Sequence, residues 1–412
     1  MSHDLSIREA SASDGAAEAL RLDDESYCFR QLAELSASVE LPKLNLHRAT
    51  MGLQTALLLY QSLETGKALC LISEKTSDTE AASIAGRIPP TLPADTALVL
   101  FTSGSDGLPK GVRLSRQALV ASARASEQRL GWYGADRWLC ALPLAHIGGL
   151  SILLRCLVSR KAAYLSKGFN SGDVATAIVR HKITHISLVP TMLWRLLEDG
   201  FSCPDHLQVT LMGGAALDSD LARRARSAGF RLRVSYGMTE SASQIVTDGK
   251  ALNGVSLRIR DERLEIKGPM LMDGYLPPHS DESFRSSSWF RTQDRATIAE
   301  DGHLTILGRA DELIISGGEN IDPREVEAGL NRCPFISTSL AIGLPHEEWG
   351  QELVALVVPS SPEVSSAQLH SHQLKAHLRP KQLLAIDALP VLDNGKVHHA
   401  AARALLLSAR KS

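Results

Sequence analysis

The stretch FTSGSDGLPKG, residues 101–111, combines the residue types that bind phosphate groups in proteins. It follows a β-rich apolar run at residues 97–102, so we expect a strand that ends in a glycine-rich loop. Glycines let backbone N–H groups approach an anion closely, and Lys110 adds a positive charge. The Gly-Lys-Ser/Thr ending of a Walker A loop is missing, so this loop would be of another kind. An ordinary glycine-rich turn is the alternative explanation.

Six further motifs follow along the chain. They are LPLAH at residues 142–146, MGGA at 212–215, SYGMTE at 235–240, FRTQD at 290–294, GRADELIISGGENI at 308–321 and NGK at 394–396. Together with residues 101–111 they resemble, in the same order, the motifs of the adenylate-forming superfamily. That superfamily contains acyl-CoA synthetases, luciferases and the adenylation domains of peptide synthetases. Seven ordered matches make a chance resemblance negligible.

The resemblance implies a reaction in which a carboxylate attacks the α-phosphorus of ATP and becomes an acyl-adenylate. Two anions meet in this step, so the site needs fixed cations and hydrogen-bond donors. By resemblance, the nucleotide would be bound by Thr102, Ser103, Gly104, Ser105, Lys110, Gly213, Gly214, Ala215, Ser235, Tyr236, Gly237, Met238, Thr239, Asp294, Arg309 and Lys396.

The phosphate groups and the metal ion have their own residues within this set. The resemblance implies that Ser103, Gly104 and Lys110 hold the β- and γ-phosphates. It also implies that Thr239 contacts the α-phosphate and that Glu240 holds Mg²⁺, a hard cation that prefers oxygen ligands. A surface or helix-capping acid is the alternative reading of Glu240.

Other motifs would bind the ribose and the adenine of ATP and the carboxylic acid. By resemblance, Asp294 accepts hydrogen bonds from the ribose hydroxyls with Arg309 beside it, and Tyr236 faces the adenine. Lys396 would neutralise charge at the carboxylate and the α-phosphate, and His146 would lie beside the acyl pocket as a fourth catalytic residue with Thr239 and Glu240. The alternatives are a turn-capping Asp294, a solvated Lys396 and a core His146.

A hinge would let one protein run two half-reactions. By resemblance, the C-terminal domain swings about Asp311, so that Lys396 is delivered for adenylation and then withdrawn. The second orientation would open a tunnel for coenzyme A, lined by Gly317 and Gly318, where a side chain would obstruct the thiol. Alternation of two domain states separates these requirements.

Local strings narrow the family. The segments SYGMTESASQIVT, FRTQDRA and ISGGENIDPREVE resemble those of o-succinylbenzoate–CoA ligases. The expected substrates are therefore ATP, coenzyme A and a small carboxylic acid, o-succinylbenzoate. Three alternatives stay open: a CoA ligase for another aryl or medium-chain acid, an enzyme that loads a carrier protein, and a degenerate nucleotide-binding sensor.

Two positions depart from the family pattern. Asp106 stands where threonine is usual, and at about 4 Å a phosphate would repel it by ~4 kcal/mol at an effective dielectric of ~20. We therefore expect Asp106 to point outward or to meet Mg²⁺. Gln293 stands where glycine is usual and would alter the local turn. The region before the phosphate loop is also short, at about 100 residues.

Alternating strands and helices must position these motifs. We expect buried strands at residues 97–102, 185–189, 209–212 and 232–236, and helices at 173–181 and 216–228. That alternation predicts an α/β fold with a large N-terminal body of helix-covered mixed sheets. A β-barrel-like part is expected to complete this body.

The pattern of apolar and charged residues changes beyond residue 245. The alternation of residues 257–266 predicts one antiparallel strand. A boundary near Gly308 would separate an ATP- and acyl-binding domain, residues 1–308, from a small mobile α+β domain, residues 309–412, with the hinge and Lys396. The small domain is expected to contain strands at residues 339–342 and 352–358 and helices at 323–330 and 367–378.

Composition excludes several protein classes. The 412 residues include 44 basic and 46 acidic side chains, a net charge of −2, without the clustered basic face of a nucleic-acid binder. The polar start is unlike a secretory signal, and the apolar run at residues 147–158 is too short to span a bilayer. Six scattered cysteines predict free, mostly buried thiols. We expect a cytoplasmic protein, and a homodimer is one expected assembly because relatives often dimerise.

Overall fold

A computed structural model describes residues 5–102, 109–132, 134–277, 289–370, 374–392, 395 and 397–409. The chain divides into two compact units. Unit 1 comprises Met1–Leu257, Ile266–Phe290 and Ala299–Leu304, and unit 2 comprises Arg258–Glu265, Arg291–Ile298 and Thr305–Ser412. Two segments of unit 2, residues 258–265 and 291–298, thus precede Gly308 in the sequence. The functional division at Gly308 stays a prediction.

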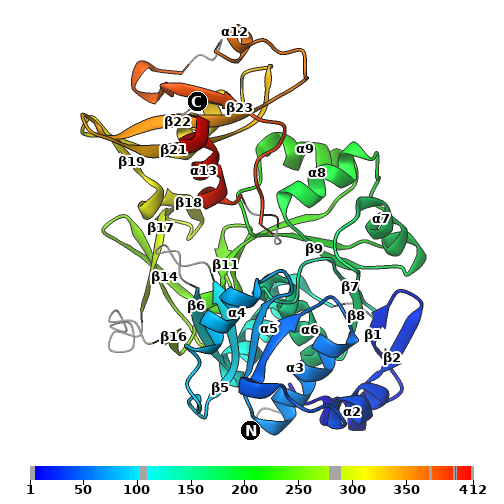
Figure 1. Ribbon diagram of the computed structural model, residues 1–412. Coiled ribbons are helices and arrows are strands. Elements are labelled where there is room, and N and C mark those ends of the chain that lie inside the picture. The colour runs from blue at the N-terminus through cyan, green and yellow to red at the C-terminus, as the bar shows by residue number, and fades with distance from the viewer. Residues whose placement is uncertain are drawn as a thin grey trace. The chain divides into compact units, whose positions relative to one another are not determined.

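The largest sheet of unit 1 has nine strands (Figure 1). In sheet order they are β13 (Lys250–Ala251), β12 (Ser243–Thr247), β11 (Leu232–Met238), β10 (Val209–Met212), β9 (His185–Leu188), β7 (Arg137–Cys140), β8 (Ala162–Leu165), β1 (Glu18–Leu22) and β2 (Glu25–Cys28). The strands from β11 to β1 run parallel, whereas β12, β13 and β2 add antiparallel pairs. The predicted mixed sheet is therefore confirmed.

A second sheet of unit 1 has five strands. In sheet order they are β16 (Gly274–Leu276), β6 (Lys110–Ser115), β5 (Thr96–Thr102), β4 (Leu69–Ser73) and β3 (Leu46–Ala49). The strands β3, β4 and β5 are parallel, and β6 returns antiparallel beside β5. All described sheets are open, so the expected barrel-like part does not exist as a closed barrel among the described strands.

Helices cover these sheets. They are α1 (Ile7–Asp14), α2 (Phe29–Ala37), α3 (Leu53–Thr65), α4 (Asp78–Ala85), α5 (Arg116–Leu130), α6 (Ile147–Ser159), α7 (Ser171–Arg180), α8 (Pro190–Glu198) and α9 (Ser219–Ser227). Apolar side chains of α7, α8 and α9 form one core with the strands that they follow. Asp218 caps α9 by accepting from two backbone N–H groups. The helix therefore begins later than the predicted residue 216, because a cap residue lies outside its helix.

The predicted strands of unit 1 are present, with one correction. Strands β9 and β10 are fully buried, as expected, because helices cover them. Strand β11 was also expected to be buried, but Arg233, Val234 and Gly237 are exposed. This strand is followed by the antiparallel β12, and Arg233 reaches Asp248 near the solvent.

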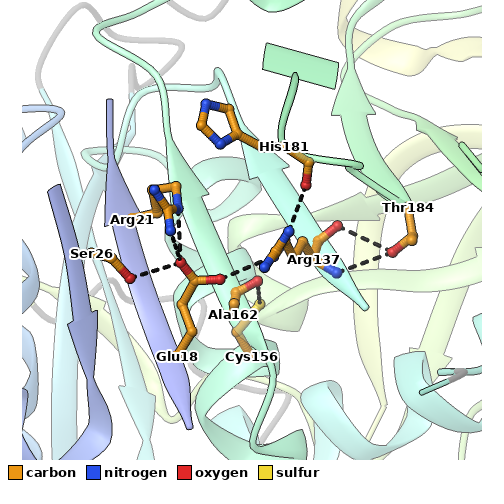
Figure 2. A network of polar contacts seen from close by, with 8 residues as sticks. All are labelled: Glu18, Arg21, Ser26, Arg137, Cys156, Ala162, His181 and Thr184. Atoms are coloured by element: carbon orange, nitrogen blue, oxygen red, sulfur yellow. Dashed lines mark hydrogen bonds and ion pairs between the residues drawn. The ribbon is translucent and has the colours of Figure 1, made fainter. Parts of the chain in front are cut away.

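A network of polar contacts links β1 and β2, at one edge of the nine-stranded sheet, to β7 of the same sheet (Figure 2). Glu18 accepts hydrogen bonds from Ser26 and Arg21, each at 2.7 Å, and from Arg137 Nε at 2.9 Å. Arg137 also donates to the carbonyl oxygen of His181 at 2.8 Å. The carboxylate of Glu18 thus ties strand β1 to strand β7 across the intervening β8.

A four-stranded sheet contains the segments at the boundary of the units. Its strands are, in sheet order, β14 (Ser256–Arg260), β15 (Arg263–Lys267), β17 (Phe290–Ile298) and β18 (Leu304–Arg309). The prediction of one strand over residues 257–266 is wrong, because a two-residue turn divides it. Asp261 and Glu262 adopt φ values of 48° and 61°, the conformation that a tight hairpin turn requires.

The C-terminal sheet of unit 2 is antiparallel except for one edge. Its strands are, in sheet order, β20 (Glu319–Ile321), β19 (Ile314–Ser316), β22 (Gly350–Pro359) and β21 (Ile336–His346), with β23 (Gln382–Ala385) parallel to β22. The accompanying helices are α11 (Pro323–Leu330), α12 (Ser366–Leu369) and α13 (His399–Ala409), with short 3₁₀ turns η3 (Ala310–Glu312) and η4 (Ala376–Leu378).

Helix α11 begins and ends where the sequence predicts. The helix predicted over residues 367–378 is present only in part among the described residues, because α12 ends at Leu369 and residues 376–378 form the 3₁₀ turn η4. Pro380 disfavours helical backbone in the residue before it, which leaves only the 3₁₀ turn η4 near that end.

All six cysteines are free, and four of them are buried, as expected from the sequence. None of the helices in the described ranges is long and apolar enough to cross a bilayer.

Candidate functional site

Strand β11 leads into the 3₁₀ turn η2 (Thr239–Ser241). This turn carries the predicted site residues Thr239 and Glu240. Ser241 is fully buried, and its Oγ accepts from the N–H of Met238 at 3.1 Å and donates to the carbonyl oxygen of Ser243 at 2.8 Å. The Ser241 side chain therefore holds the backbone on both sides of the turn, at Met238 and at Ser243. Thr239 and Glu240 are half-buried on this turn.

Tyr275 orients the carboxylate of Glu240. The phenol donates to Glu240 Oε1 at 3.0 Å. Burial and the Glu240 charge raise the pKa of Tyr275, so the phenol stays protonated and remains a donor. The sequence carries no signal for this contact, because Tyr275 lies 35 residues from Glu240 and belongs to no recognised motif.

Glu240 fits the role of a ligand to a divalent cation. One carboxylate oxygen is held by Tyr275, and the other has no hydrogen-bond partner within the described part of the chain. Carboxylate oxygens are the ligands that Mg²⁺ prefers, with phosphate and water completing its octahedron. The described residues contain no group of three or more His, Cys, Asp or Glu side chains that could hold a metal ion.

Two glycines let neighbouring backbones approach at the ends of β10 and β11. A Cβ on Gly237 would lie 2.0 Å from the carbonyl oxygen of Ser243, so no larger residue fits there. A Cβ on Gly213 would lie 3.1 Å from Ser235 Oγ, which donates to the carbonyl oxygen of Met212 at 2.9 Å. These contacts bring the MGGA and SYGMTE motifs together.

Other members of these two motifs lie along the same edge. Gly214 and Ala215 are exposed after β10. Tyr236 is half-buried and pairs with Val246 of β12, and Met238 caps the η2 turn. The adenine-binding role of Tyr236 stays a prediction.

The predicted phosphate loop is described only at its two ends. Thr102 and Lys110 are paired residues of the antiparallel strands β5 and β6, and Thr102 Oγ1 donates to the Lys110 carbonyl at 3.4 Å. Strand β6, which Lys110 begins, lies against the η2 turn. The predictions for Ser103, Gly104, Ser105 and Asp106 fall outside the described residues.

His146 caps helix α6 through its backbone. Its carbonyl accepts from the N–H of Leu150 at 3.0 Å, and its own N–H donates to the carbonyl of Pro143 at 3.1 Å. The ring is half-buried, and it makes no capping hydrogen bond. The pocket-lining role of His146 stays a prediction.

In unit 2 the structure brings together Asp294, Arg309 and Asp311. Arg309 Nε and Nη2 donate to the two oxygens of Asp311 at 2.9 and 2.7 Å, and Arg309 Nη1 lies 3.9 Å from Asp294 Oδ1. Burial alone would lower the pKa of Arg309, but the hydrogen bonds and charge of Asp311 outweigh it and raise that pKa. Gln293 is an exposed residue within β17, so no turn forms at this position.

The two predicted tunnel glycines follow strand β19 in unit 2. Gly317 and Gly318 adopt φ values of 59° and 85°, which favour glycine, and a Cβ on either would meet no atom within 4 Å. The N–H of Gly317 donates to the carbonyl of Trp349 at 3.0 Å. His346 stacks on the Trp349 ring, and Lys381 Nζ lies 4.3 Å from its centroid. Lys396 falls outside the described residues.

Family comparisons agree with these motifs. The AMP-binding enzyme model matches residues 20–276, and the model of the AMP-binding enzyme C-terminal domain matches residues 325–396. The chain is 35% identical over 325 residues to the 2-succinylbenzoate–CoA ligase of Staphylococcus aureus (strain MSSA476), and 36% over 324 residues to that of Bacillus velezensis. The alignments cover 74% and 72% of this chain and 66%, just under two thirds, of each relative.

Solved structures give the same grouping. The o-succinylbenzoate CoA synthetase of Bacillus subtilis, in complex with an acyl-adenylate intermediate, matches with a TM-score of 0.84 at 27% identity over 96% of both chains. Its complex with ATP and magnesium matches with a TM-score of 0.83 at 26% identity, over 97% of this chain and 99% of that one. The order of motifs, the family models and these relatives agree, and the chain belongs to the family of AMP-binding enzymes.

Proposed function

We propose that this protein is an ATP-dependent, AMP-forming ligase that joins o-succinylbenzoate to coenzyme A. One observation carries the proposal. The turn Thr239–Ser241 carries Glu240, and the hydrogen bond from Tyr275 orients its carboxylate so that one oxygen can bind a metal ion. The chain that carries this arrangement is 35% identical to a 2-succinylbenzoate–CoA ligase. A carboxylate becomes a good acylating agent only after its oxygen is made part of a good leaving group. Attack of the carboxylate on the α-phosphorus of ATP achieves this, because it releases pyrophosphate and leaves an acyl-adenylate from which AMP can depart.

The first half-reaction is assigned to residues of both units. Ser103, Gly104 and Lys110 hold the β- and γ-phosphates, and Thr239 contacts the α-phosphate. Lys396 supplies positive charge where the carboxylate meets phosphorus. Such groups act by stabilising charge in the transition state, so their effect belongs mainly in kcat.

The proposed metal ion is Mg²⁺, and Glu240 holds it. A bound Mg²⁺ neutralises phosphate charge and helps to orient the nucleotide. Tyr275 keeps the Glu240 carboxylate facing one way, because its phenol occupies Oε1. The remaining oxygen of Glu240 is then available to the cation.

The second half-reaction is assigned to a change of domain orientation. Residues 1–308 form the ATP- and acyl-binding domain, and residues 309–412 form the mobile domain that carries Lys396. Asp311 is the hinge, and Gly317 and Gly318 leave space for the coenzyme A thiol. The open surroundings of both glycines support this assignment.

The assembly and location are also proposals. The net charge of −2 without a basic cluster supports an enzyme of small molecules that binds no nucleic acid. We propose a cytoplasmic homodimer, and light scattering of the purified full chain tests its mass.

Pyrophosphate release tests the function. The purified protein is given ATP, Mg²⁺ and a panel of aryl and medium-chain acids, with and without coenzyme A. We expect selective turnover of o-succinylbenzoate and a CoA thioester detected by mass. Turnover of another acid would support the proposed ligation reaction and refute o-succinylbenzoate as the substrate. If no acid causes pyrophosphate release while the protein still binds ATP, the proposal of a ligase is refuted and a nucleotide sensor is favoured.

Lys396→Ala tests the assignment of the lysine. This variant should lose pyrophosphate release and keep thioester formation from supplied acyl-adenylate. Lys381→Ala, which removes a cation of the same domain, is the matched control and should keep pyrophosphate release. Equal loss in both half-reactions of Lys396→Ala would refute its role.

A further inference from the structure

Arg113 is a buried arginine of strand β6 in unit 1, and only 5% of its surface is exposed. Removing a charged side chain from water is costly, and an apolar side chain of similar size would fill the same space at a lower cost. A buried arginine is therefore informative where its guanidinium makes a specific contact. The contact of Arg113 is with Asp273, the residue that precedes strand β16.

Arg113 binds both main-chain groups of Asp273. The carbonyl oxygen of Arg113 accepts from the N–H of Asp273 at 2.9 Å. The Nη2 group of Arg113 donates to the carbonyl oxygen of Asp273 at 2.8 Å. The first bond belongs to the backbone and is kept in any variant, whereas the second exists only because the side chain is arginine. The guanidinium therefore adds a second attachment where β16 begins to pair with β6.

The residues on the two sides of Asp273 hold Glu240. The N–H of Met272 donates to the carbonyl oxygen of Glu240 at 2.7 Å, and the Tyr275 phenol donates to Glu240 Oε1 at 3.0 Å. Met272 thus fixes the backbone of Glu240, and Tyr275 fixes its carboxylate. Both donors lie within two residues of Asp273, so a movement of the chain at Asp273 would displace both of them together.

Lys110 and Glu240 are thereby connected through one strand. Lys110 begins β6, and Arg113 lies on the same strand three residues later. Strand β16 pairs with β6 in antiparallel register, with Gly274 opposite Arg113. A path from Lys110 to Glu240 therefore runs along β6 to Arg113 and then across to the segment Met272–Tyr275.

We propose that Arg113 is a positioning residue for Glu240, because it holds the segment Met272–Tyr275 on β6 and so sets the position of the proposed metal ligand relative to Lys110. The roles of Glu240 and Lys110 rest on the proposed function. Arg113 acts through the main chain of Asp273, which no substitution at position 273 removes. The test is therefore made at Arg113 itself.

Three variants and one control test this role. Arg113→Met removes the charge and the donors at similar length, Arg113→Lys keeps a cationic donor, and Tyr275→Phe removes the donor to the Glu240 carboxylate. Arg116→Met is the matched control, because Arg116 Nη1 also donates to a main-chain carbonyl, that of Leu63 on α3, at 2.6 Å. All variants are compared as full-length protein, with activity normalised to the folded fraction.

Hydrogen exchange of the peptide that spans residues 270–276 reads the held segment directly. We expect Arg113→Met to speed exchange there by about tenfold or more, while Arg116→Met leaves it unchanged below its unfolding temperature. Equal protection in Arg113→Met and wild type would overturn the proposal. This readout needs no catalysis, so it decides whether Arg113 holds the segment even where the wild-type protein releases no pyrophosphate and the proposed function fails.

The dependence of pyrophosphate release on Mg²⁺ supplies the second readout. Arg113→Met should raise the Mg²⁺ concentration for half-maximal rate by about fivefold or more, because Glu240 is held less firmly, and Arg113→Lys should recover part of this change. An arginine with a purely structural role would change the folded fraction and leave this concentration as in wild type. In an active enzyme, that result would overturn the positioning of Glu240.

The double variant Arg113→Met with Tyr275→Phe tests the path of the effect. Its change in Mg²⁺ dependence should be less than the sum of the two single changes, because both substitutions act on Glu240 through the same segment. Fully additive effects would refute action through that segment. If Arg113→Met fails to fold, Arg113→Lys must change both readouts in the same direction, and wild-type values in both would overturn the proposal.

Discussion

Arg309 donates from Nε and Nη2, one edge of its guanidinium, to the two carboxylate oxygens of Asp311 at 2.9 and 2.7 Å, while its Nη1 lies 3.9 Å from Asp294 Oδ1. The planar fork of arginine matches a carboxylate in this geometry and fixes both partners. One side chain thus links the residue proposed to bind ribose with the residue proposed as hinge. A change at Asp311 therefore has two effects, on the hinge backbone and on Arg309.

Two substitutions at Asp311 separate these effects. Asp311→Pro should leave pyrophosphate release within about threefold and slow thioester formation from supplied acyl-adenylate by about tenfold or more, because proline fixes φ and also restricts the preceding residue. Asp311→Ala releases Arg309 equally but leaves the backbone free. Rapid-quench measurement of each half-reaction checks this, and equal thioester rates in the two variants would contradict the hinge.

Tyr275 and Glu240 give a prediction about metal dependence. Glu240→Gln should raise the Mg²⁺ concentration for half-maximal pyrophosphate release by about tenfold or more, because a charged oxygen ligand is lost. Tyr275→Phe should raise it less, by up to about tenfold, since Glu240 keeps its charge and loses only the hydrogen bond that orients it. Tyr27→Phe is the control, because Tyr27 donates to the Glu25 carboxylate in the N-terminal hairpin. An effect of Tyr27→Phe equal to that of Tyr275→Phe would contradict the prediction.

Local pattern predicted the elements whose signals are local. Helix α11 begins at Pro323 after the Asp322 cap, and strand β10 is a run of buried apolar residues that ends before two glycines. The hairpin turn at Asp261 and Glu262 could not be predicted, because acidic residues in a positive-φ turn replace the usual asparagine and glycine.

Some features of the candidate site could likewise be predicted from local sequence pattern, and others could not. The strands predicted at residues 209–212 and 232–236 are neighbours in one sheet, and this arrangement brings Gly213, directly after β10, close to Ser235 of β11. The contact of Tyr275 with Glu240 is not predicted, since it joins residues 35 positions apart. Only three-dimensional packing brings such residues together, and an isolated tyrosine carries no spacing signal.

The Glu18 network predicts an acid-sensitive contribution to stability. Burial raises the pKa of Glu18, but hydrogen bonds from Ser26 and Arg21 and the charge of Arg137 outweigh it, so the folded pKa lies below the ordinary 4.5. The folded state then binds fewer protons than the unfolded state, and the contribution is complete above pH 4.5 and lost as pH falls through the folded pKa.

Glu18→Gln should therefore lower the free energy of unfolding at pH 7 by about 1–3 kcal/mol, because charged hydrogen bonds are lost. Urea unfolding at pH 7 and at pH 3.5 measures the difference, which should shrink at the lower pH. Glu25→Gln is the matched control, since Glu25 is exposed on the adjacent strand. A loss that does not depend on pH would contradict the prediction.

Glu327 predicts the opposite pH dependence. Burial raises its pKa to about 7, although Oε1 accepts from the N–H of Ala341 at 3.0 Å. Between pH 4.5 and about 7 the folded state binds more protons than the unfolded state, so stability falls as pH rises through this range. Glutamine keeps the acceptor for Ala341 and removes the charge that burial disfavours.

Glu327→Gln should thus stabilise the protein above pH 7 by up to about 3 kcal/mol, at 1.36 kcal/mol for each unit of pKa. At pH 4.5 the two proteins should unfold at nearly the same temperature, because Glu327 is then protonated in the folded state. Thermal unfolding across pH 4.5–8.5 measures this convergence. Glu325→Gln, two residues earlier in the same helix and exposed, is the control for a general loss of negative charge. A Tm that does not rise at pH 8 in Glu327→Gln would show that the buried carboxylate is already compensated by its surroundings.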